Sequence, residues 1–299
     1  MGLTLTEWFG FDLADDSLRA AEARSREHCP FIDARCTKRF RDNTVSGACS
    51  VAQSNNEPVI ICPNRLYAED YRVLSDICEV AFGPGMKLLH PSRARDVTHS
   101  GQYVVPFGRR FGKELQLPSA SNDGAGGYYV DWILTRIGPD AQLAEFVAVE
   151  VQTIDTTGSY KSLVEQLRVG EMPSGSAKAG FNWENVNKRI LPQLIYKGHT
   201  LRREALCTKG LFFVCPGAVY ERIQRRLGAK LLSYPNLHPG SISFHWYNLG
   251  PFDGGLRQLV SGGHFSTTVD QVALAFTSPM NLPPPGVYES AIRRALDEL

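Results

Sequence analysis

The stretch YYVDWILTRIGPDAQLAEFVAVEVQT, residues 128–153, decides the fold of this chain. It contains two apolar runs, at 128–137 and 143–152, on either side of a Gly-Pro-Asp turn signal at 138–140. Runs rich in β-branched and aromatic residues, separated by such a turn, are typical of two paired strands. The stretch therefore predicts a β-hairpin.

The hairpin is expected to bring polar side chains together on one face. Side chains alternate between the faces of a strand, so Glu150 and Gln152 share the face that the neighbouring valines do not use. If the turn is centred near residues 140–141, Asp131 lies opposite Glu150, because each is about equally far from the turn. Directly opposed side chains are roughly 5 Å apart. Two carboxylates at that distance repel, which forces one towards its neutral form unless a cation lies between them.

A close pair of acids on an otherwise apolar hairpin is a candidate site for a divalent metal. Mg²⁺ commonly takes one or two carboxylates and keeps several waters for chemistry on phosphates. The pattern of Asp131, then Glu150 nineteen residues later, then Gln152 is the layout of the metal-dependent nuclease core written PD-(D/E)xK. Gln152 stands where that core has Lys. An acid at a strand end is more often only solvated, and this short pattern does not by itself decide between the two interpretations.

Length, composition and charge limit the class of protein. The chain has 299 residues, of which 43% are hydrophobic, enough for one large domain or two. The sequence shows no signal peptide and no apolar stretch of membrane-spanning length, so we expect a cytoplasmic protein. A net charge of +1 is too low for a dedicated non-specific nucleic-acid binder. A sequence-specific binder needs only local clusters of Lys and Arg, and each cluster in this chain is also compatible with a solvated helix face.

Four of the seven cysteines fall within 34 residues, in a segment that is polar and loop-like. These are Cys29, Cys36, Cys49 and Cys62. Four thiolates can bind Zn²⁺ or Fe tetrahedrally and replace a core that the segment is too polar to build. Without a secretory signal a metal is favoured over disulfides, although the spacing lacks the CxxC pairs of common zinc modules.

Two further residues are candidates for support of the acidic site. Glu114 lies upstream of the first strand and is interpreted either as a third acid or as a surface charge. Lys161 begins a predicted helix at 160–169, close in sequence to Gln152, and is a candidate for contact with a phosphate.

Three segments resemble the NotI-type restriction endonuclease family, and the chain has the length of its shorter members. They are CPFIDARCTKRFRDNTVSGACSV (29–51) with ICPNRLY (61–67), VDWIL…VAVEVQTIDTTGSY (130–160), and GFNWENVNKRILPQLIYKG (180–198). The resemblance runs from about residue 29 to 215 and beyond. It implies an α/β (α+β) fold with a PD-(D/E)xK core, in which a mixed sheet is flanked by helices, plus a small four-cysteine element. The predicted division is 1–82, containing the element at 29–62, and 83–299, the catalytic and DNA-recognition domain.

The resemblance also implies roles for individual residues. Asp131 and Glu150 match the acids that bind catalytic Mg²⁺, and Gln152 matches the third active-site member. The four clustered cysteines match ligands of iron, with zinc left open. Recognition of a GC-rich sequence needs Lys or Arg side chains that contact guanine O6 and N7, and acidic side chains that accept from cytosine N4. The candidates for DNA contact are Asn182, Asn185, Lys188, Arg189, Lys38 and Arg39.

The function that this resemblance implies is a prokaryotic type II restriction endonuclease. Such an enzyme binds double-stranded DNA as a homodimer and cuts a GC-rich palindrome, with a GGCC core flanked by C and G as in CGGCCG, to leave four-base 5′ overhangs. It acts alongside a DNA methyltransferase without forming a stable complex. The alternative is a sequence-specific DNA-binding protein with a degenerate core that does not cleave, which Gln152 keeps open. Mg²⁺-dependent cleavage separates the two.

Overall fold

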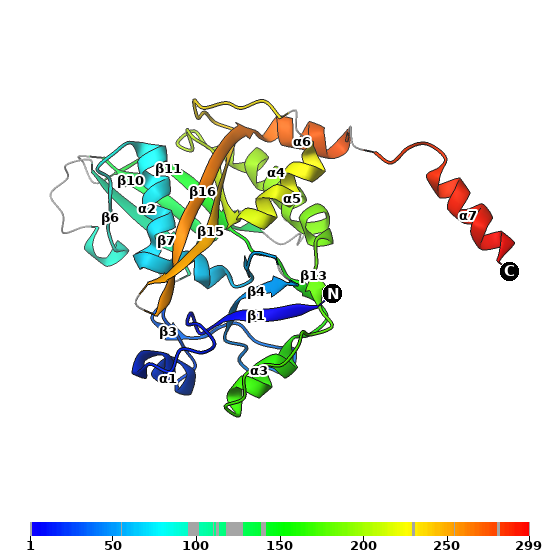
Figure 1. Ribbon diagram of the computed structural model, residues 1–299. Helices are drawn as coiled ribbons and strands as arrows, with labels where there is room; N and C mark the ends of the chain where they lie inside the picture. The colour runs from blue at the N-terminus through cyan, green and yellow to red at the C-terminus, as the bar shows by residue number, and fades with distance from the viewer. Residues whose placement is uncertain are drawn as a thin grey trace.

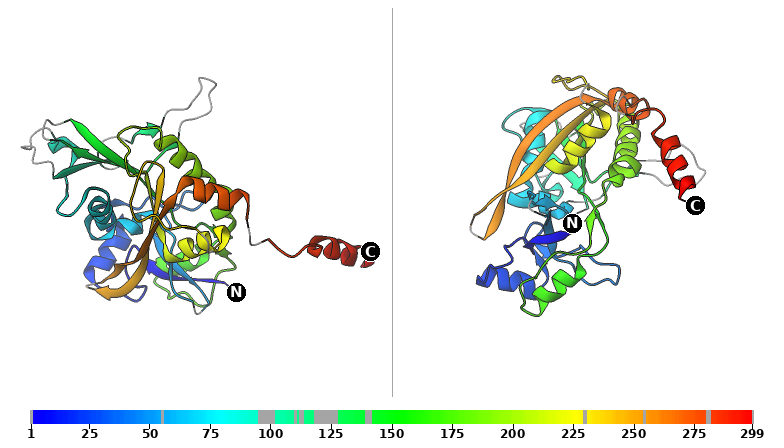
Figure 2. Two further views of the ribbon diagram at one scale, coloured as in Figure 1. Left: turned by 90° about the horizontal axis from the view of Figure 1, so that it is seen from above. Right: turned by 45° about the vertical axis from the view of Figure 1, so that its right-hand side comes forward.

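The structure is a computed structural model, shown in Figures 1 and 2. It describes residues 2–54, 56–94, 102–109, 111, 114–117, 128–138, 142–228, 231–253, 255–279 and 282–298. A mixed seven-stranded sheet forms the centre of this part of the chain, in the order β16-β15-β14-β11-β10-β7-β6. The strands are β6 (Lys87–Leu88), β7 (Tyr103–Gly108), β10 (Trp132–Ile137), β11 (Leu143–Val151), β14 (Leu211–Pro216), β15 (Ser241–Asp253) and β16 (Leu256–Thr268).

The predicted hairpin is the pair β10 and β11, which is antiparallel. Trp132 pairs with Val149, so the next position along the two strands brings Asp131 beside Glu150, as the distance from the turn predicts. The expected turn centre at 140–141 lies outside the described residues. The first apolar run is interrupted before Trp132, and its first two residues form β9 (Tyr128–Tyr129), which pairs with β8 (Gln116–Leu117).

Strand β11 is the buried middle of the sheet. Its last five residues are all buried, so both of its faces are covered there. It pairs in parallel with β14, which pairs in parallel with β15, and β15 turns back into β16 as a long hairpin that arches across one side of the molecule (Figures 1 and 2). The mixed α/β sheet with flanking helices agrees with the predicted fold class. The assignment as a PD-(D/E)xK core stays a prediction.

Helices flank the sheet on several sides. Helix α2 (Ala68–Phe82) packs against β10 and β16, and α4 (Leu191–Leu201) and α5 (Gly217–Leu227) pack against β14. A π-helical turn, Val186–Ile190, runs directly into α4, which has Pro192 in its first turn. Helices α3 (Lys161–Arg168) and α6 (Val269–Thr277) complete this part of the fold. Helix α7 (Val287–Asp297) buries no residue and projects from the body (Figure 1).

The N-terminal part adds a small sheet of its own. Strands β1 (Leu3–Trp8), β4 (Ala48–Gln53) and β5 (Val59–Ile60) pair in the order β1-β4-β5. Between them lie α1 (Leu18–Ser25), β2 (His28–Cys29) and β3 (Ala34–Arg35), and a 3-10 helix, Pro63–Tyr67, leads into α2. Ser17 caps α1, because its side chain accepts a hydrogen bond from the backbone N–H of Ala20. Residues on both sides of position 82 share one buried core.

A completely buried ion pair fastens this N-terminal part to the main sheet. Arg65 Nε lies 3.1 Å from Glu7 Oε1, and neither side chain has any exposed surface. Ser50 Oγ donates to Glu7 Oε2 at 2.6 Å. Arg65 also donates through Nη2 to the carbonyl oxygen of Arg257 on β16 at 2.6 Å. Its guanidinium group lies 4.6 Å from the centre of the Phe31 ring, in the cysteine-rich segment, residues 29–62. One side chain therefore joins β1, β16 and the cysteine-rich segment.

Replacing Arg65 with Met should lower the free energy of unfolding by about 3–5 kcal/mol, because Glu7 then stays buried without its cation. Urea denaturation measures the loss. The double variant Glu7→Gln/Arg65→Met should lose less than Arg65→Met alone, since no unpaired charge remains. Arg26→Met, which breaks an exposed pair with Glu22, should change stability by no more than about 1 kcal/mol. Equal losses in Arg65→Met and Arg26→Met would contradict this account.

In the part of the chain that the structure describes, none of the helices combines the length and the apolar character needed to cross a lipid bilayer.

Candidate active site

A cleft of about 500 Å³ brings together the three segments singled out by sequence. One wall comes from the cysteine-rich segment, the floor from the end of β11, and the other wall from the π-helical turn. The lining includes Thr37, Lys38, Arg39, Cys62, Asn64, Arg109, Glu114, Asp131, Gln152, Asp155, Asn185 and Arg189. A larger hollow of about 610 Å³ opens beside α5, but neither acid of the hairpin lines it, so we place the chemistry in the smaller cleft.

Asp131 is held at the end of the cleft by the backbone of the opposite strand. Its Oδ2 accepts a hydrogen bond from the N–H of Val151 at 2.8 Å. The carboxylate thereby satisfies an N–H that a continuous strand would have paired, which explains why the first apolar run is interrupted at this residue. Burial, and then the charge of Glu150, raise the pKa of Asp131 to about 7. Burial and a neighbouring negative charge both disfavour the ionised form of a carboxyl group.

Glu150 lies behind the lining of the cleft, with both carboxylate oxygens engaged. The Nε2 of Gln152 donates to Oε1 at 2.9 Å, and the Nζ of Lys197 donates to Oε2 at 2.7 Å. Glu150 and Lys197 are both nearly fully buried, and Lys197 comes from α4. Gln152 lines the cleft and Glu150 does not, so Glu150 is linked to the cleft lining through the bond from Gln152 to Oε1.

Sequence reasoning missed Lys197, although a signal for it was present. In α4 the buried stripe runs through Leu194, Lys197 and Leu201, so the lysine occupies a position where the helical period calls for an apolar residue. A lysine is almost never fully buried unless it is paired. A lysine on the apolar stripe of a helix therefore indicates a buried acid on the neighbouring element.

A family model described as restriction endonuclease NotI matches residues 13–209. The chain belongs to the NotI restriction endonuclease family. The resemblance drawn from the three segments is thus confirmed, and every residue that lines the cleft falls within the matched range. Membership of the NotI family implies a type II restriction enzyme, and hence a site-specific deoxyribonuclease that binds DNA. Among curated proteins, none was found to match the chain.

The two candidate supporting residues of this NotI-family chain differ in position. Glu114 lines the cleft, and its charge contributes to raising the pKa of Asp131. Lys161 does not line the cleft: its Nζ lies 2.5 Å from Asp42 Oδ2 and 3.2 Å from Glu165 Oε1. It joins α3 to the cysteine-rich segment instead, because the chain after Gln152 turns away from the cleft before α3 begins.

Four of the six candidates for DNA contact line the cleft: Lys38, Arg39, Asn185 and Arg189. Two of them share a partner, since Asn185 Nδ2 donates to Asp155 Oδ2 at 2.8 Å and Arg189 Nη1 lies 3.5 Å from the same oxygen. Lys188 pairs with Glu184 on the exposed side of the same turn, and Asn182, just before the turn, is also outside the lining.

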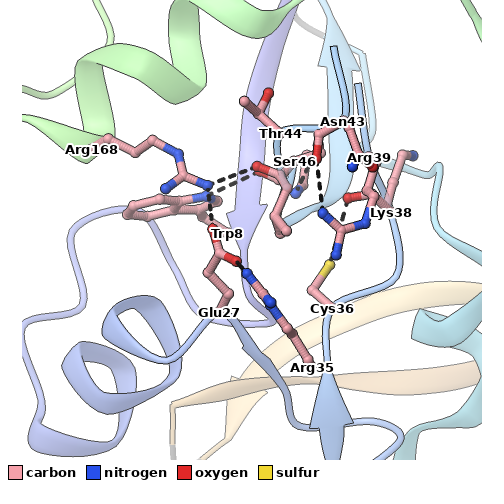
Figure 3. Close-up of polar contacts among 12 residues, drawn as sticks. Trp8, Glu27, Arg35, Cys36, Lys38, Arg39, Asn43, Thr44, Ser46 and Arg168 are labelled. Atoms are coloured by element: carbon pink, nitrogen blue, oxygen red, sulfur yellow. Dashed lines mark hydrogen bonds and ion pairs between the residues drawn. The ribbon is translucent and has the colours of Figure 1, made fainter. Parts of the chain in front are cut away.

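Polar contacts hold the wall of the cleft that carries Lys38 and Arg39 (Figure 3). Arg39 donates to the carbonyl oxygen of Asn43 at 2.8 Å, as Figure 3 shows. Lys38 donates to the carbonyl oxygen of Ile61. Arg168 of α3 donates to Glu27 at 3.0 Å and to the carbonyl oxygen of Val45 at 2.8 Å. The basic residues of this NotI-family wall are therefore held by bonds to the backbone of their own segment and by an adjacent helix.

The four clustered cysteines are all buried and free of disulfides. Burial, and then the charge of Cys62, raise the pKa of Cys29 to about 12, and burial followed by neighbouring thiols also raises the pKa of Cys49. The four sulfurs are thus close enough to affect one another. Within the described residues, however, no group of three or more His, Cys, Asp or Glu side chains is arranged to hold a metal ion. The donor chemistry of four thiols fits zinc or iron, and binding of either ion stays a prediction.

Stability of the NotI-family chain should depend on pH through Asp131. Its pKa is about 7 in the fold but near 3.8 when unperturbed, so the unfolded chain ionises first as pH rises. The contribution of Asp131 to stability is therefore complete below about pH 4 and is lost progressively up to about pH 7, with a slope of at most about 1.4 kcal/mol per pH unit. Urea midpoints measured from pH 5 to pH 7 should fall more steeply for the metal-free wild type than for Asp131→Asn. Parallel midpoints in the two proteins would show that Asp131 ionises normally.

Proposed function

We propose that this chain hydrolyses double-stranded DNA at a GC-rich palindrome, with Mg²⁺ bound by Asp131 and Glu150. The palindrome has a GGCC core flanked by C and G, and cleavage leaves four-base 5′ overhangs. The observation that best supports the proposal is the cleft itself. It joins a carboxylate pair to a wall of basic residues, in a chain of a restriction endonuclease family.

The oxygen donors of the cleft suit a hard cation. Mg²⁺ prefers carboxylate oxygens and retained waters, and Asp131 and Glu150 supply two carboxylates beside a polar cleft. When bound, Mg²⁺ supplies Lewis-acid chemistry: it lowers the pKa of a water and neutralises charge that develops on the phosphate. Asp131 would offer the oxygen that faces the cleft, and Glu150 the oxygen that now accepts from Gln152.

Gln152 would position the attacking water. Its amide nitrogen donates to Glu150, so its amide oxygen is the end of the side chain that can accept a hydrogen bond from a water. An amide carries no net charge and cannot neutralise the phosphate as a lysine does. In this proposal the basic wall and the metal must supply that charge. Gln152→Ala separates this role from that of an ordinary strand residue.

DNA would be read from both walls of the cleft. Arg and Lys can contact guanine O6 and N7, and Asn can contact adenine or the backbone. Asn185 and Arg189, both held by Asp155, and Lys38 and Arg39 are the residues proposed for this. A palindrome presents two identical half-sites, so two copies of the chain related by a two-fold axis would each cut one strand. A methyltransferase that modifies the same site would protect the host DNA without a stable complex.

The test is cleavage of a plasmid that contains CGGCCG, followed by mapping of the ends. With Mg²⁺ we expect cuts at that site with GGCC 5′ overhangs, and with EDTA no cuts. A matched plasmid in which the site is changed to CGGCTG controls for specificity. Specific binding of the CGGCCG duplex without cleavage in Mg²⁺ would instead favour the DNA-binding protein with a degenerate core.

A further inference from the structure

We propose that Lys197, from the neighbouring helix, positions Glu150 for cleavage through a buried positive charge on its carboxylate. The strand cannot provide that charge, because Gln152 stands where a PD-(D/E)xK core has its lysine. This inference rests on the proposed function, because it assigns a role in the same cleavage reaction. Lys197 is a positioning residue, since it touches Glu150 and does not line the cleft.

The geometry brackets the Glu150 carboxylate between two donors. Lys197 Nζ is 2.7 Å from Oε2, and Gln152 Nε2 is 2.9 Å from Oε1. The side chains of Lys197 and Glu150 are 5% and 6% exposed. A carboxylate held at Oε2 by a buried cation cannot turn freely about its last bond. Oε1 is then held in one orientation against Gln152, which lines the cleft.

In this chain the positive charge beside Glu150 comes from a helix and not from the strand that carries the acid. Strand β11 ends with Glu150, Val151 and then Gln152, so the position after the acid carries an amide. Helix α4, which packs on the neighbouring strand β14, directs Lys197 at the same acid. Both arrangements place a nitrogen donor on Glu150, but only the helix contributes a cation.

An ordinary structural ion pair between α4 and the sheet is the competing explanation. A buried pair that serves only packing can be replaced by apolar residues of similar volume with little loss, or even a gain, of stability. Such a pair gives no reason for the cleavage rate to depend on a cation at this place. The two explanations therefore differ in catalysis and not in folding.

The experiment compares wild type, Lys197→Met, Lys197→Arg and the double variant Gln152→Lys/Lys197→Met on a CGGCCG duplex. Single-turnover cleavage in saturating Mg²⁺ gives the chemical rate, and fluorescence anisotropy in Ca²⁺ gives duplex affinity. We expect Lys197→Met to cleave about 100-fold or more slowly, as for loss of one preorganised charged donor, with duplex affinity changed by less than about threefold. Lys197→Arg should stay within about tenfold of wild type. The double variant, which returns a lysine to the strand beside Glu150, should recover at least about tenfold over Lys197→Met.

Lys209→Met is the matched control. Lys209 also pairs with a glutamate of β11, Glu145 Oε2 at 2.9 Å, but near the other end of the strand and away from the cleft. Its cleavage rate should stay within about threefold of wild type, because no donor to Glu150 is lost. Melting temperatures of all variants separate loss of folding from loss of chemistry. If Lys197→Met does not fold, Lys197→Gln keeps a donor without the charge and is expected to show the same rate loss.

The outcomes distinguish this inference from the proposed function. A wild type that cuts no duplex overturns both. A wild type that cuts, together with a folded Lys197→Met or Lys197→Gln of equal rate, overturns this inference alone. This inference is also overturned if Lys197→Met cleaves slowly and the double variant Gln152→Lys/Lys197→Met cleaves no faster. A cation on the strand beside Glu150 should be able to replace the one lost from the helix.

Discussion

Asp131→Asn and Glu150→Gln should each slow Mg²⁺-dependent cleavage of a CGGCCG duplex by about 10³-fold or more. Either change removes a carboxylate proposed to bind the ion, and a metal contributes several kcal/mol to stabilising charge in such a reaction. The amide variants keep the size of the side chain, so the cleft keeps its shape. Single-turnover rates in excess enzyme measure the effect, and anisotropy in Ca²⁺ measures duplex binding.

The two variants should differ in stability although both lose activity. Loss of activity in a variant that is as stable as wild type cannot come from unfolding. Asp131→Asn removes a carboxyl group whose ionisation is disfavoured by burial and by Glu150, so this variant should be at least as stable as wild type near pH 8. Glu150→Gln leaves Lys197 buried without its anion, so it should be less stable than wild type. Glu165→Gln changes an exposed acid of α3 and serves as the control, with the wild-type rate expected. Wild-type cleavage by either Asp131→Asn or Glu150→Gln would reject the assignment of these acids.

A metal in the four-cysteine segment, residues 29–62, would have the largest effect on folding. If the four thiols bind zinc or iron, as the family resemblance implies, removing the ion should withdraw folding free energy on the order of 10 kcal/mol from this segment. Lys38 and Arg39 lie in that segment and line the cleft, so duplex binding should weaken before the acids on β11 are disturbed. Hydrogen exchange after chelation should show faster exchange at 29–62 than at 143–152.

Serine substitutions provide the matched comparison. Cys36→Ser should lose metal and loosen the segment, whereas Cys207→Ser, at an equally buried thiol outside the segment, should keep the full metal content. Elemental analysis and the absorption spectrum distinguish iron from zinc. A protein shown to be metal-free that still binds and cuts DNA at wild-type rates would contradict the proposed role.

The hairpin was predictable because local rules determine it. Alternation of apolar residues and equal distance from the turn brought Asp131 beside Glu150, and the strand pairing agrees. The interruption before Trp132 was not predictable, because it depends on one hydrogen bond from Val151 to the Asp131 side chain. The parallel placement of β14 and β15 beside β11 likewise depends on packing between distant parts of the chain.

Which side chains line the cleft also depends on contacts between distant parts of the chain, which the sequence does not show. Lys161 follows Gln152 closely in sequence yet pairs with Asp42, 119 residues earlier, because α3 packs on the cysteine-rich segment. Lys197 is 47 residues from Glu150 and contacts it directly. Nearness in sequence therefore pointed to a lysine that does not line the cleft, whereas helical periodicity, applied to Lys197, would have identified a buried cation. The low net charge did not exclude local basic clusters, and basic residues from separate segments do gather on the cleft walls.

The bond from Arg65 to the carbonyl oxygen of Arg257 bears on the order in which a newly made chain completes its fold. The two residues are 192 positions apart, so the ribosome must add β16 before this bond can form. Until then Glu7 and Arg65 lack part of their surroundings. The N-terminal sheet should therefore reach its full stability only after β16 has been made.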